Sequence, residues 1–356
     1  MFQKIFYIRF ILLFFGGSIF SSANAQIGGT GIFANLDAPM SARSLAWGGY
    51  LIAQPQTDIQ YAVHNPALLN ESILNQYGAS FGTLIAGSNG VSPVRHGGAG
   101  YAFKIKKQLF SFHAQYIDYG TMKGYDEGGN YQTDIIANEL KFTIGYAKKL
   151  HKHLNVGAQT GFAYSVLGPY VSNGAFLNLG ALYSRSDTGV QVGMVVKNLG
   201  YQIAVYKDAE RESLPFNIQI GASYKPVHMP FRFHAVLHSL QRWDLTFNQY
   251  LSSGQIDLSG QEVNNNPANF LAKGFRHLAI GGELVLGKNM GILFGYNHQR
   301  RMEMSPEIRP GLAGFGWGIK FKVWKYHLTY ASASLFPGQN ANTLSLTLIP
   351  QSLFTK

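Results

Sequence analysis

In the stretch HLNVGAQTGFAYSVLG, residues 153–168, mostly apolar residues alternate with small or polar ones. Leu154, Val156 and Phe162 fall on one side of an extended chain, whereas small or polar residues such as Gln159 fall on the other. Successive side chains of a strand point to opposite faces, so a period of two predicts a β-strand with one apolar face. The stretch therefore predicts a strand that separates an apolar environment from a polar one.

The same alternation resumes through Leu199 and then recurs to the C-terminus. A soluble sandwich also alternates, but long runs behind a secretion signal favour a transmembrane barrel of about fourteen antiparallel strands, an all-β fold. The strands are predicted at Tyr77–Leu84, His96–Lys106, Gln108–Tyr119, Ile136–Lys148, His153–Leu167, Gly174–Arg185, Thr188–Leu199, Phe216–Lys225, Phe231–Ser239, Phe275–Gly287, Met290–Gln299, Leu312–Val323, Lys325–Ser334 and Ala341–Pro350.

The links between these runs are alternately short and long, without exception. The long ones include Gly120–Ile135, Gly168–Asn173, Leu335–Asn340 and the largest, Leu240–Gly274. Short periplasmic turns and longer extracellular loops are expected of outer-membrane barrels. We therefore expect both termini on the periplasmic side of the outer membrane of a Gram-negative bacterium.

The first 25 residues are typical of a secretory signal peptide. Lys4 and Arg9 precede or flank a short apolar run, and Ala23-Asn24-Ala25 is a cleavage site, so the mature chain is expected to begin at Gln26. An uncleaved anchor is the alternative, but the apolar run falls short of the ~20 residues that a spanning helix needs. The sequence contains no Cys, which excludes a disulfide framework for this exported chain.

The composition combines few charges with many aromatic residues and glycines. Charged residues make up 13%, against 41 Gly, 20 Tyr and 25 Phe, which suits a barrel with lipid outside and aromatic girdles. The net charge of +11 could indicate nucleic acid binding, which export argues against. Lipopolysaccharide, outer-membrane lipid or another anionic partner is the better candidate, and plain solvation with anchoring at the membrane interface is the alternative.

Residues 26–76 do not alternate and are rich in turn formers and small apolar residues. A segment of this length ahead of a closed barrel can fold inward and plug the lumen. We therefore expect three parts: a signal peptide at 1–25, a hatch at 26–76 and a barrel at 77–356. The residues expected to matter in the hatch are Trp47, Asn65, Pro66 and Ala67. A periplasmic tail is the alternative.

No catalytic, cofactor or metal signature stands out, and we expect a chain that is not an enzyme. A hydrolase on the barrel wall remains a third interpretation, with polar wall residues available at His113, Asp118, Ser165, His234, His238 and Glu283. Glu283 lies on a polar face and is expected to pair with a lumenal Lys320 or Lys322.

Three residues at the base of the largest loop, Arg242, Trp243 and Asp244, are candidates for binding a partner, because Trp and Arg are favoured at protein interfaces. The competing interpretation of Trp243 is a girdle residue at the membrane edge. Arg300, Arg301 and Arg309 belong to another outer loop and are expected to meet an anionic or protein partner, unless they are only solvated.

Taken together, several motifs resemble the PorQ family, outer-membrane components of the type IX (Por) secretion system. They are IGGTG at Ile27–Gly31, SARSLAWGG at Ser41–Gly49, HNPALLN at His64–Asn70, LPFNIQIG at Leu214–Gly221, RFHAVLHSLQRWDLT at Arg232–Thr246, GYNHQRR at Gly295–Arg301 and RPGLAGFGWGIK at Arg309–Lys320. This family is similar to PorV and, more remotely, to FadL-type barrels with an N-terminal hatch.

The resemblance implies a non-enzymatic role in the attachment complex with PorU and PorV. There the barrel would hold a PorZ-like surface protein while the sortase-like PorU cleaves cargo and joins it to anionic lipopolysaccharide. A FadL-type transporter of a hydrophobic small molecule is the alternative. It would need an apolar lumenal pocket, whereas the residues expected to face the lumen, such as Gln191, Gln219 and Lys320, are mostly polar.

Overall fold

The computed structural model of the chain describes residues 32–54, 58–87, 92–185, 187–207, 210–246, 269–304, 311–336 and 338–349. All of them belong to the compact unit Gly31–Lys356. The expected signal peptide, its cleavage site and the motif at Ile27–Gly31 lie outside the described residues.

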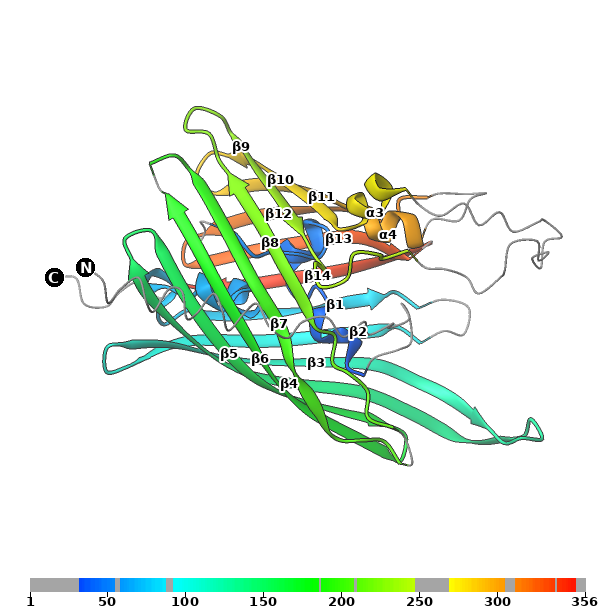
Figure 1. Ribbon diagram of the computed structural model, residues 1–356. Coiled ribbons are helices and arrows are strands. Elements are labelled where there is room, and N and C mark those ends of the chain that lie inside the picture. Colours follow the sequence, from blue (N-terminus) through cyan, green and yellow to red (C-terminus); the bar gives the residue numbers. More distant parts are fainter. Residues whose placement is uncertain are drawn as a thin grey trace. The chain divides into compact units, whose positions relative to one another are not determined.

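Fourteen strands form a closed antiparallel barrel, in which each strand pairs with its neighbours in sequence and β1 pairs with β14 (Figure 1). The predicted fold is therefore confirmed. The strands are β1 Tyr77–Ile85, β2 Val94–Ile105, β3 Gln108–Tyr125, β4 Tyr131–His151, β5 Leu154–Leu167, β6 Tyr170–Arg185, β7 Val190–Ala204, β8 Asn217–Tyr224, β9 Phe231–Leu237, β10 Leu278–Leu286, β11 Met290–Asn297, β12 Phe315–Val323, β13 Tyr326–Phe336 and β14 Gln339–Leu348.

The wall follows the alternation seen in the sequence. On β5, Gln159, Ala163 and Ser165 are buried, whereas Phe162 and Tyr164 are exposed on the outer face. The outward side chains of the other strands are likewise largely apolar, as a wall in contact with lipid requires. Closure leaves no unpaired sheet edge, because every strand has two hydrogen-bonded neighbours.

Three of the links that were predicted to be long are shorter than predicted. β3 and β4 extend toward each other until Tyr125 pairs with Tyr131. Only two residues separate the end of β5 at Leu167 from the start of β6 at Tyr170, and β13 ends at Phe336, just before β14 begins. The predicted strict alternation of short and long links therefore fails at β5–β6 and β13–β14, whereas the shortened β3–β4 link is still longer than the links on either side of it. The added parts of β3 and β4 carry polar residues on both faces, so they lack the apolar alternation by which the other strands were found.

Two strand ends were also predicted wrongly, because short helices replace them. α3, Phe270–Arg276, contains Phe275, and α4, His298–Glu303, contains Gln299. Asn269 and Asn297 start these helices as N-caps, their side chains accepting hydrogen bonds from the N–H groups of Ala272 and Arg300. None of the described helices is long and apolar enough to cross a membrane.

Residues 32–54 and 58–76, here called the N-terminal segment, pack against the inner face of the strands (Figure 1). The segment consists of short helices: η1 Ala34–Asp37, α2 Ala42–Ala46, η2 Ile59–Val63, η3 Pro66–Leu68 and η4 Glu71–Ile73. Polar side chains, among them Ser41, Asp58, Asn65 and Asn70, cap four of them. Its apolar side chains, including Leu45 and Trp47, are fully buried.

The two ends of the barrel differ. We call the end that carries the β9–β10 connection, residues 238–277, the loop end, and the opposite end, where β1 begins and β14 finishes, the turn end. α3 and α4 lie beside each other at the loop end (Figure 1).

Candidate functional site: the lumen and the loop end

A buried ionic cluster fastens the N-terminal segment to the wall. Arg43 of α2 donates to both carboxylate oxygens of Glu283 on β10, from Nη1 at 3.2 Å and from Nη2 at 3.3 Å. Arg232 on β9 contacts Oε2 at 2.6 Å, and Lys320 on β12 contacts Oε1. The predicted pairing of Glu283 with Lys320 is thereby confirmed. One buried carboxylate meets three cations, so its loss would leave them without the partner that offsets their desolvation.

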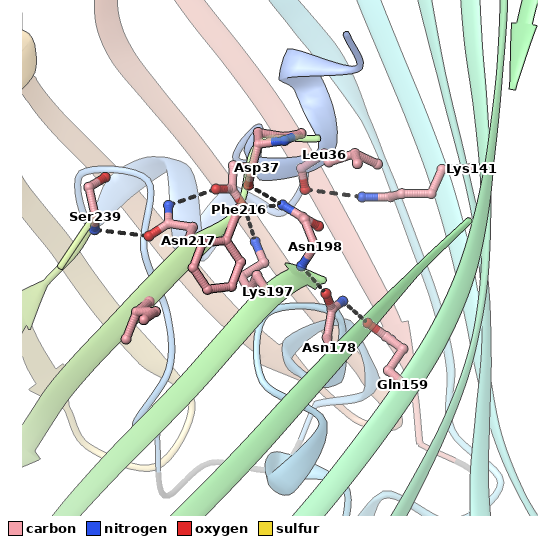
Figure 2. Close-up of polar contacts among 12 residues, drawn as sticks. Leu36, Asp37, Lys141, Gln159, Asn178, Lys197, Asn198, Phe216, Asn217 and Ser239 are labelled. Carbon is pink, nitrogen blue, oxygen red and sulfur yellow. Dashed lines mark hydrogen bonds and ion pairs between the residues drawn. The ribbon is translucent and has the colours of Figure 1, made fainter. Parts of the chain in front are cut away.

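A second polar cluster holds the start of the segment, around Asp37 of η1 (Figure 2). Lys197 on β7 forms an ion pair with Asp37, and the amide of Asn217 on β8 donates to its Oδ2 at 2.7 Å. Lys141 on β4 donates to the carbonyl oxygen of Leu36 at 3.4 Å. Burial by itself would raise the pKa of Asp37, but the charge of Lys197 and these hydrogen bonds outweigh it and hold the pKa below its ordinary value.

The predicted hatch residues all lie in this lumenal packing. The indole N–H of Trp47 donates to the carbonyl oxygen of Gly282 at 3.0 Å, and its ring stacks on His234 with centroids 4.7 Å apart. Asn65 donates to the carbonyl oxygen of Ile52 at 2.8 Å. It also accepts from the N–H of Ala67 at 2.9 Å, which orders the turn that contains Pro66.

Glycines on the inner wall make room for the segment. A Cβ added to Gly193 would overlap the carbonyl oxygen of Ile52, and one added to Gly295 would overlap that of Ala46. The segment backbone thus approaches the strands more closely than any side chain would allow. The lumen beside these strands is filled by the segment.

A cavity of about 900 Å³ opens at the loop end, in the size range of ligand pockets. Much of its lining is apolar, and the hydroxyl of Tyr206 donates to Ser165 at 2.7 Å at its wall. The lining residues are Ile85, Ser92, Val94, Tyr119, Thr121, Met122, Lys123, Asp134, Ala137, Glu139, Ser165, Val166, Leu167 and Tyr206. The sequence did not predict this cavity, because residues of the β3 and β4 extensions, such as Met122 and Asp134, and of the β7–β8 link, such as Tyr206, join the predicted strands in lining it.

The structure gathers the predicted partner residues of the β9–β10 loop around α3. The ring of Trp243 stacks on Phe270 at 4.7 Å between centroids and on His277 at 5.5 Å. Asp244 forms an ion pair with Lys273 at 2.5 Å. Burial would raise the pKa of Asp244, but hydrogen bonds from Lys273 and Thr246 lower it to about 2. Arg242 is half-buried, and its backbone N–H donates to Ser239.

The predicted arginines of the β11–β12 loop have different surroundings. Arg300 is half-buried and lies against Gly49 of the N-terminal segment, and its binding of an outside partner stays a prediction. Arg301 donates to the carbonyl oxygen of Gly311 at 2.7 Å, and its guanidinium lies 6.0 Å from the ring centroid of Phe315. Arg309 lies outside the described residues.

Sequence analysis missed a set of exposed apolar side chains on the loop-end helices and their flanks. Phe270 is 71% exposed and Leu271 68%, although both belong to a helix that packs on the barrel. We call this set, together with Trp243, the apolar cap: Trp243, Phe270, Leu271, Phe275, Met302 and Leu312. The N-cap Asn269 before an apolar run was the available signal, but the predicted strand from Phe275 obscured it.

The residues considered for a wall hydrolase do not meet. His113 contacts the carbonyl oxygen of Ile59 at 3.0 Å, Ser165 accepts from Tyr206, and His234 stacks on Trp47. Asp118 accepts from the N–H of Gly120, and Glu283 is engaged by three cations. Among the residues described, no hydrogen bond joins any two of the candidate catalytic groups.

No family model matches the chain, and no curated protein matches it. Among solved structures, the Ralstonia pickettii toluene transporter TbuX superposes with a TM-score of 0.54 at 12% identity, covering 89% of this chain and 100% of that one. The P. putida toluene transporter TodX gives 0.52 at 10% identity, covering 89% and 99%. A Pseudomonas aeruginosa FadL homologue gives only 0.46 at 10% identity, covering 87% and 98%.

At these identities the likeness establishes the fold and nothing about the ligand. The closed ring of fourteen strands and the apolar outer face agree with it. The chain therefore has the closed fourteen-stranded barrel fold that the sequence predicted and that the two toluene transporters share.

Proposed function

We propose that the chain is a non-enzymatic outer-membrane barrel that anchors a surface protein through its loop end. The apolar cap is the observation that carries the proposal. Exposed, clustered aromatic and aliphatic side chains mark protein interaction sites, and Trp is among the residues that contribute most to binding. In a barrel whose loops face outward, the apolar cap would lie at the cell surface, with both termini in the periplasm.

The lumen supports a structural role. The pairing of Arg43 with Glu283 ties the N-terminal segment to β10, the contacts of Asp37 tie it to β7 and β8, and the glycines beneath it permit close packing. A barrel filled in this way offers a rigid platform for loops. Following the resemblance to the PorQ family, we take the partner to be a PorZ-like surface protein, with PorU, PorV and lipopolysaccharide as further components of the same complex.

The proposal is tested by recovering partners of the tagged chain from its own outer membrane in mild detergent. Replacing Phe270 and Leu271 together by Ser should lower recovery of a PorZ-like protein at least about tenfold, because residues at the centre of an interface each contribute around 1–2 kcal/mol or more.

The matched control replaces Tyr125 and Tyr131 by Ser at the tip of the β3–β4 hairpin, where the two exposed rings also contact each other. This control should leave recovery unchanged. Equal recovery with Phe270→Ser/Leu271→Ser and with the unaltered chain would rule out the apolar cap as the anchor.

A second candidate function is transport of a hydrophobic small molecule. The solved structures with a similar fold include toluene transporters, which agrees better with this second candidate. The cavity of about 900 Å³ at the loop end favours this candidate, since much of its lining is apolar. Ala137→Trp should fill the cavity and abolish uptake of toluene into proteoliposomes, whereas Ala114→Trp on the outer face of β3 should not. Absence of any toluene uptake by the unaltered chain would remove this candidate.

A further inference from the structure

A groove of about 650 Å³ runs along the outer face of β8 to β12. Its walls are aromatic and its character is almost wholly apolar, with Tyr224, Phe233, Phe294, Tyr296 and Phe315 among the lining residues. The side chains of Phe233, Phe294 and Phe315 are each about half exposed. The groove therefore lies on the surface that the barrel presents to the membrane.

The register of the strands explains why this surface is hollow. One row of cross-strand neighbours runs Tyr224, Phe233, Gly282, Phe294 and Trp317. The next row, closer to the loop end, runs Ala222, Ala235, Ile280, Tyr296 and Phe315. Small residues interrupt each row of large side chains, so the small residues form a floor and the aromatic rings stand on either side.

Basic side chains lie at the loop end of the groove. The hydroxyl of Tyr296 hydrogen-bonds Nδ1 of His298 at 2.8 Å, and the guanidinium of Arg301 lies over the ring of Phe315. Burial and the nearby positive charge of Arg276 together lower the pKa of His298. Glu303 is the acidic residue of α4, and the positive charges of Arg276 and Arg300 act on its carboxylate. Two guanidinium groups and the uncharged imidazole of His298 thus lie at one end of an apolar trough.

A second groove on the outer face provides a contrast. It measures about 420 Å³, lies at the turn end over β1 to β3, β13 and β14, and has Ala79, Ala99 and Ala114 among its lining residues. Tyr77, Tyr101 and Phe112 line it, but no basic side chain does. An apolar trough in the membrane face is therefore not unusual in this barrel, and Arg276, His298 and Arg301 belong to the loop end, away from this second groove.

We propose that the groove over β8 to β12 binds an acyl chain of lipid A, whose phosphate lies against Arg276, His298 and Arg301. The chemistry follows from the shape and the charge. An apolar trough that opens onto lipid takes a hydrocarbon chain, and two guanidinium groups beside a hydrogen-bonding imidazole take an anionic head group. The choice of lipid A rests on the proposed orientation, which places the loop end in the outer leaflet. The lipid site itself is separate from the apolar cap.

The test is native mass spectrometry of the full chain in detergent, titrated with purified bisphosphorylated lipid A. The double variant Arg276→Gln/His298→Gln should weaken binding several-fold, because it removes one cation, which contributes about fivefold near an anionic surface, and one imidazole that can hydrogen-bond the phosphate. Ala235→Phe, which fills the floor of the groove, should also lower occupancy. Monophosphoryl lipid A should bind the unaltered chain more weakly, and dioleoyl phosphatidylglycerol should compete poorly.

Ala114→Phe is the matched control, because it fills the second groove by the same change and should leave lipid A binding unaltered. Each variant is first checked for folding by the shift in gel mobility that a closed barrel shows on boiling. Undiminished lipid A binding in both Ala235→Phe and Arg276→Gln/His298→Gln would overturn the proposal, as would equal loss in Ala114→Phe. Stronger binding of phosphatidylglycerol than of lipid A would overturn the choice of lipid. Recovery of a surface partner depends on Phe270 and Leu271, so either proposal can fail without the other.

Discussion

The barrel wall and the N-terminal segment that packs against its inner face are stabilised in different ways. In the wall, every strand is hydrogen-bonded on both sides, and the outer side chains need only be apolar. In the segment, short helices depend on individual caps, on the Glu283 and Asp37 clusters and on glycines in the wall. A repeated interaction tolerates single changes better than a unique one does, so single substitutions should distinguish the two regions.

The largest effect is expected for Glu283→Gln. The change leaves Arg43, Arg232 and Lys320 buried without their carboxylate, and breaking a buried ionic partnership in this way costs about 3–5 kcal/mol. Detachment of the N-terminal segment should appear as faster protease cleavage between residues 32 and 76 in the folded barrel. Glu71→Gln is the control, because Glu71 is 69% exposed in its pair with Lys104 and such pairs contribute about 0–1 kcal/mol. Equal protection in Glu283→Gln and the unaltered chain would contradict the role given to the cluster.

A charged side chain on the lipid-facing side should destabilise the barrel wall rather than the N-terminal segment. Phe162 lies near the middle of β5 and points outward, so Phe162→Arg is expected to cost about 2–4 kcal/mol, the range found at the bilayer midplane. The measurement is the denaturant midpoint of the gel mobility shift in lipid vesicles. Leu150→Arg, near the turn end of β4, should cost about 0–1 kcal/mol because it lies near the interface. Similar losses for both variants would argue against the depth assigned to β5.

A smaller effect is expected where wall and segment touch. Gly193→Ala places a methyl group against the backbone at Ile52 and should destabilise the segment by about 1–3 kcal/mol, the usual cost of overpacking. Gly97→Ala is matched to it, since the nearest atom to the new Cβ would be 3.8 Å away. Amide exchange of residues 45–54 should rise in the first variant only. An equal rise in both would mean that close approach is not what Gly193 provides.

The smallest effect is a pH dependence of the segment alone. The pKa of Asp37 lies below its ordinary value of about 3.9, so its contribution is complete above that value and is lost as the pH falls through the lowered pKa. The protection factors of amides near η1, corrected for the intrinsic exchange rate at each pH, should therefore fall on acidification below about pH 4, while those in β5 stay constant. Asp37→Asn should show no such dependence. A pH profile unchanged by this substitution would assign the titration to another group.

The amino-acid sequence by itself determined the wall. Leu154, Val156 and Phe162 alternate with Gln159 and Ser165 because each strand must present one face to lipid and one to the lumen, and that requirement is local. The number of strands follows from counting such runs. The pairing of Glu283 with Lys320 was also predictable, since both lie on polar faces of neighbouring parts of the wall.

Only the tertiary structure decided what lies inside and on the wall. Arg43 joins Glu283 across 240 positions of sequence, and no periodicity in either region encodes that contact. The extension of β3 and β4 and the start of α3 depend on hairpin pairing and on capping by Asn269, which the alternation does not reveal. The groove over Ala222 and Ala235 exists because strand register places these small residues of β8 and β9 opposite each other. Register is a property of the closed barrel, and it is settled only when distant strands pair.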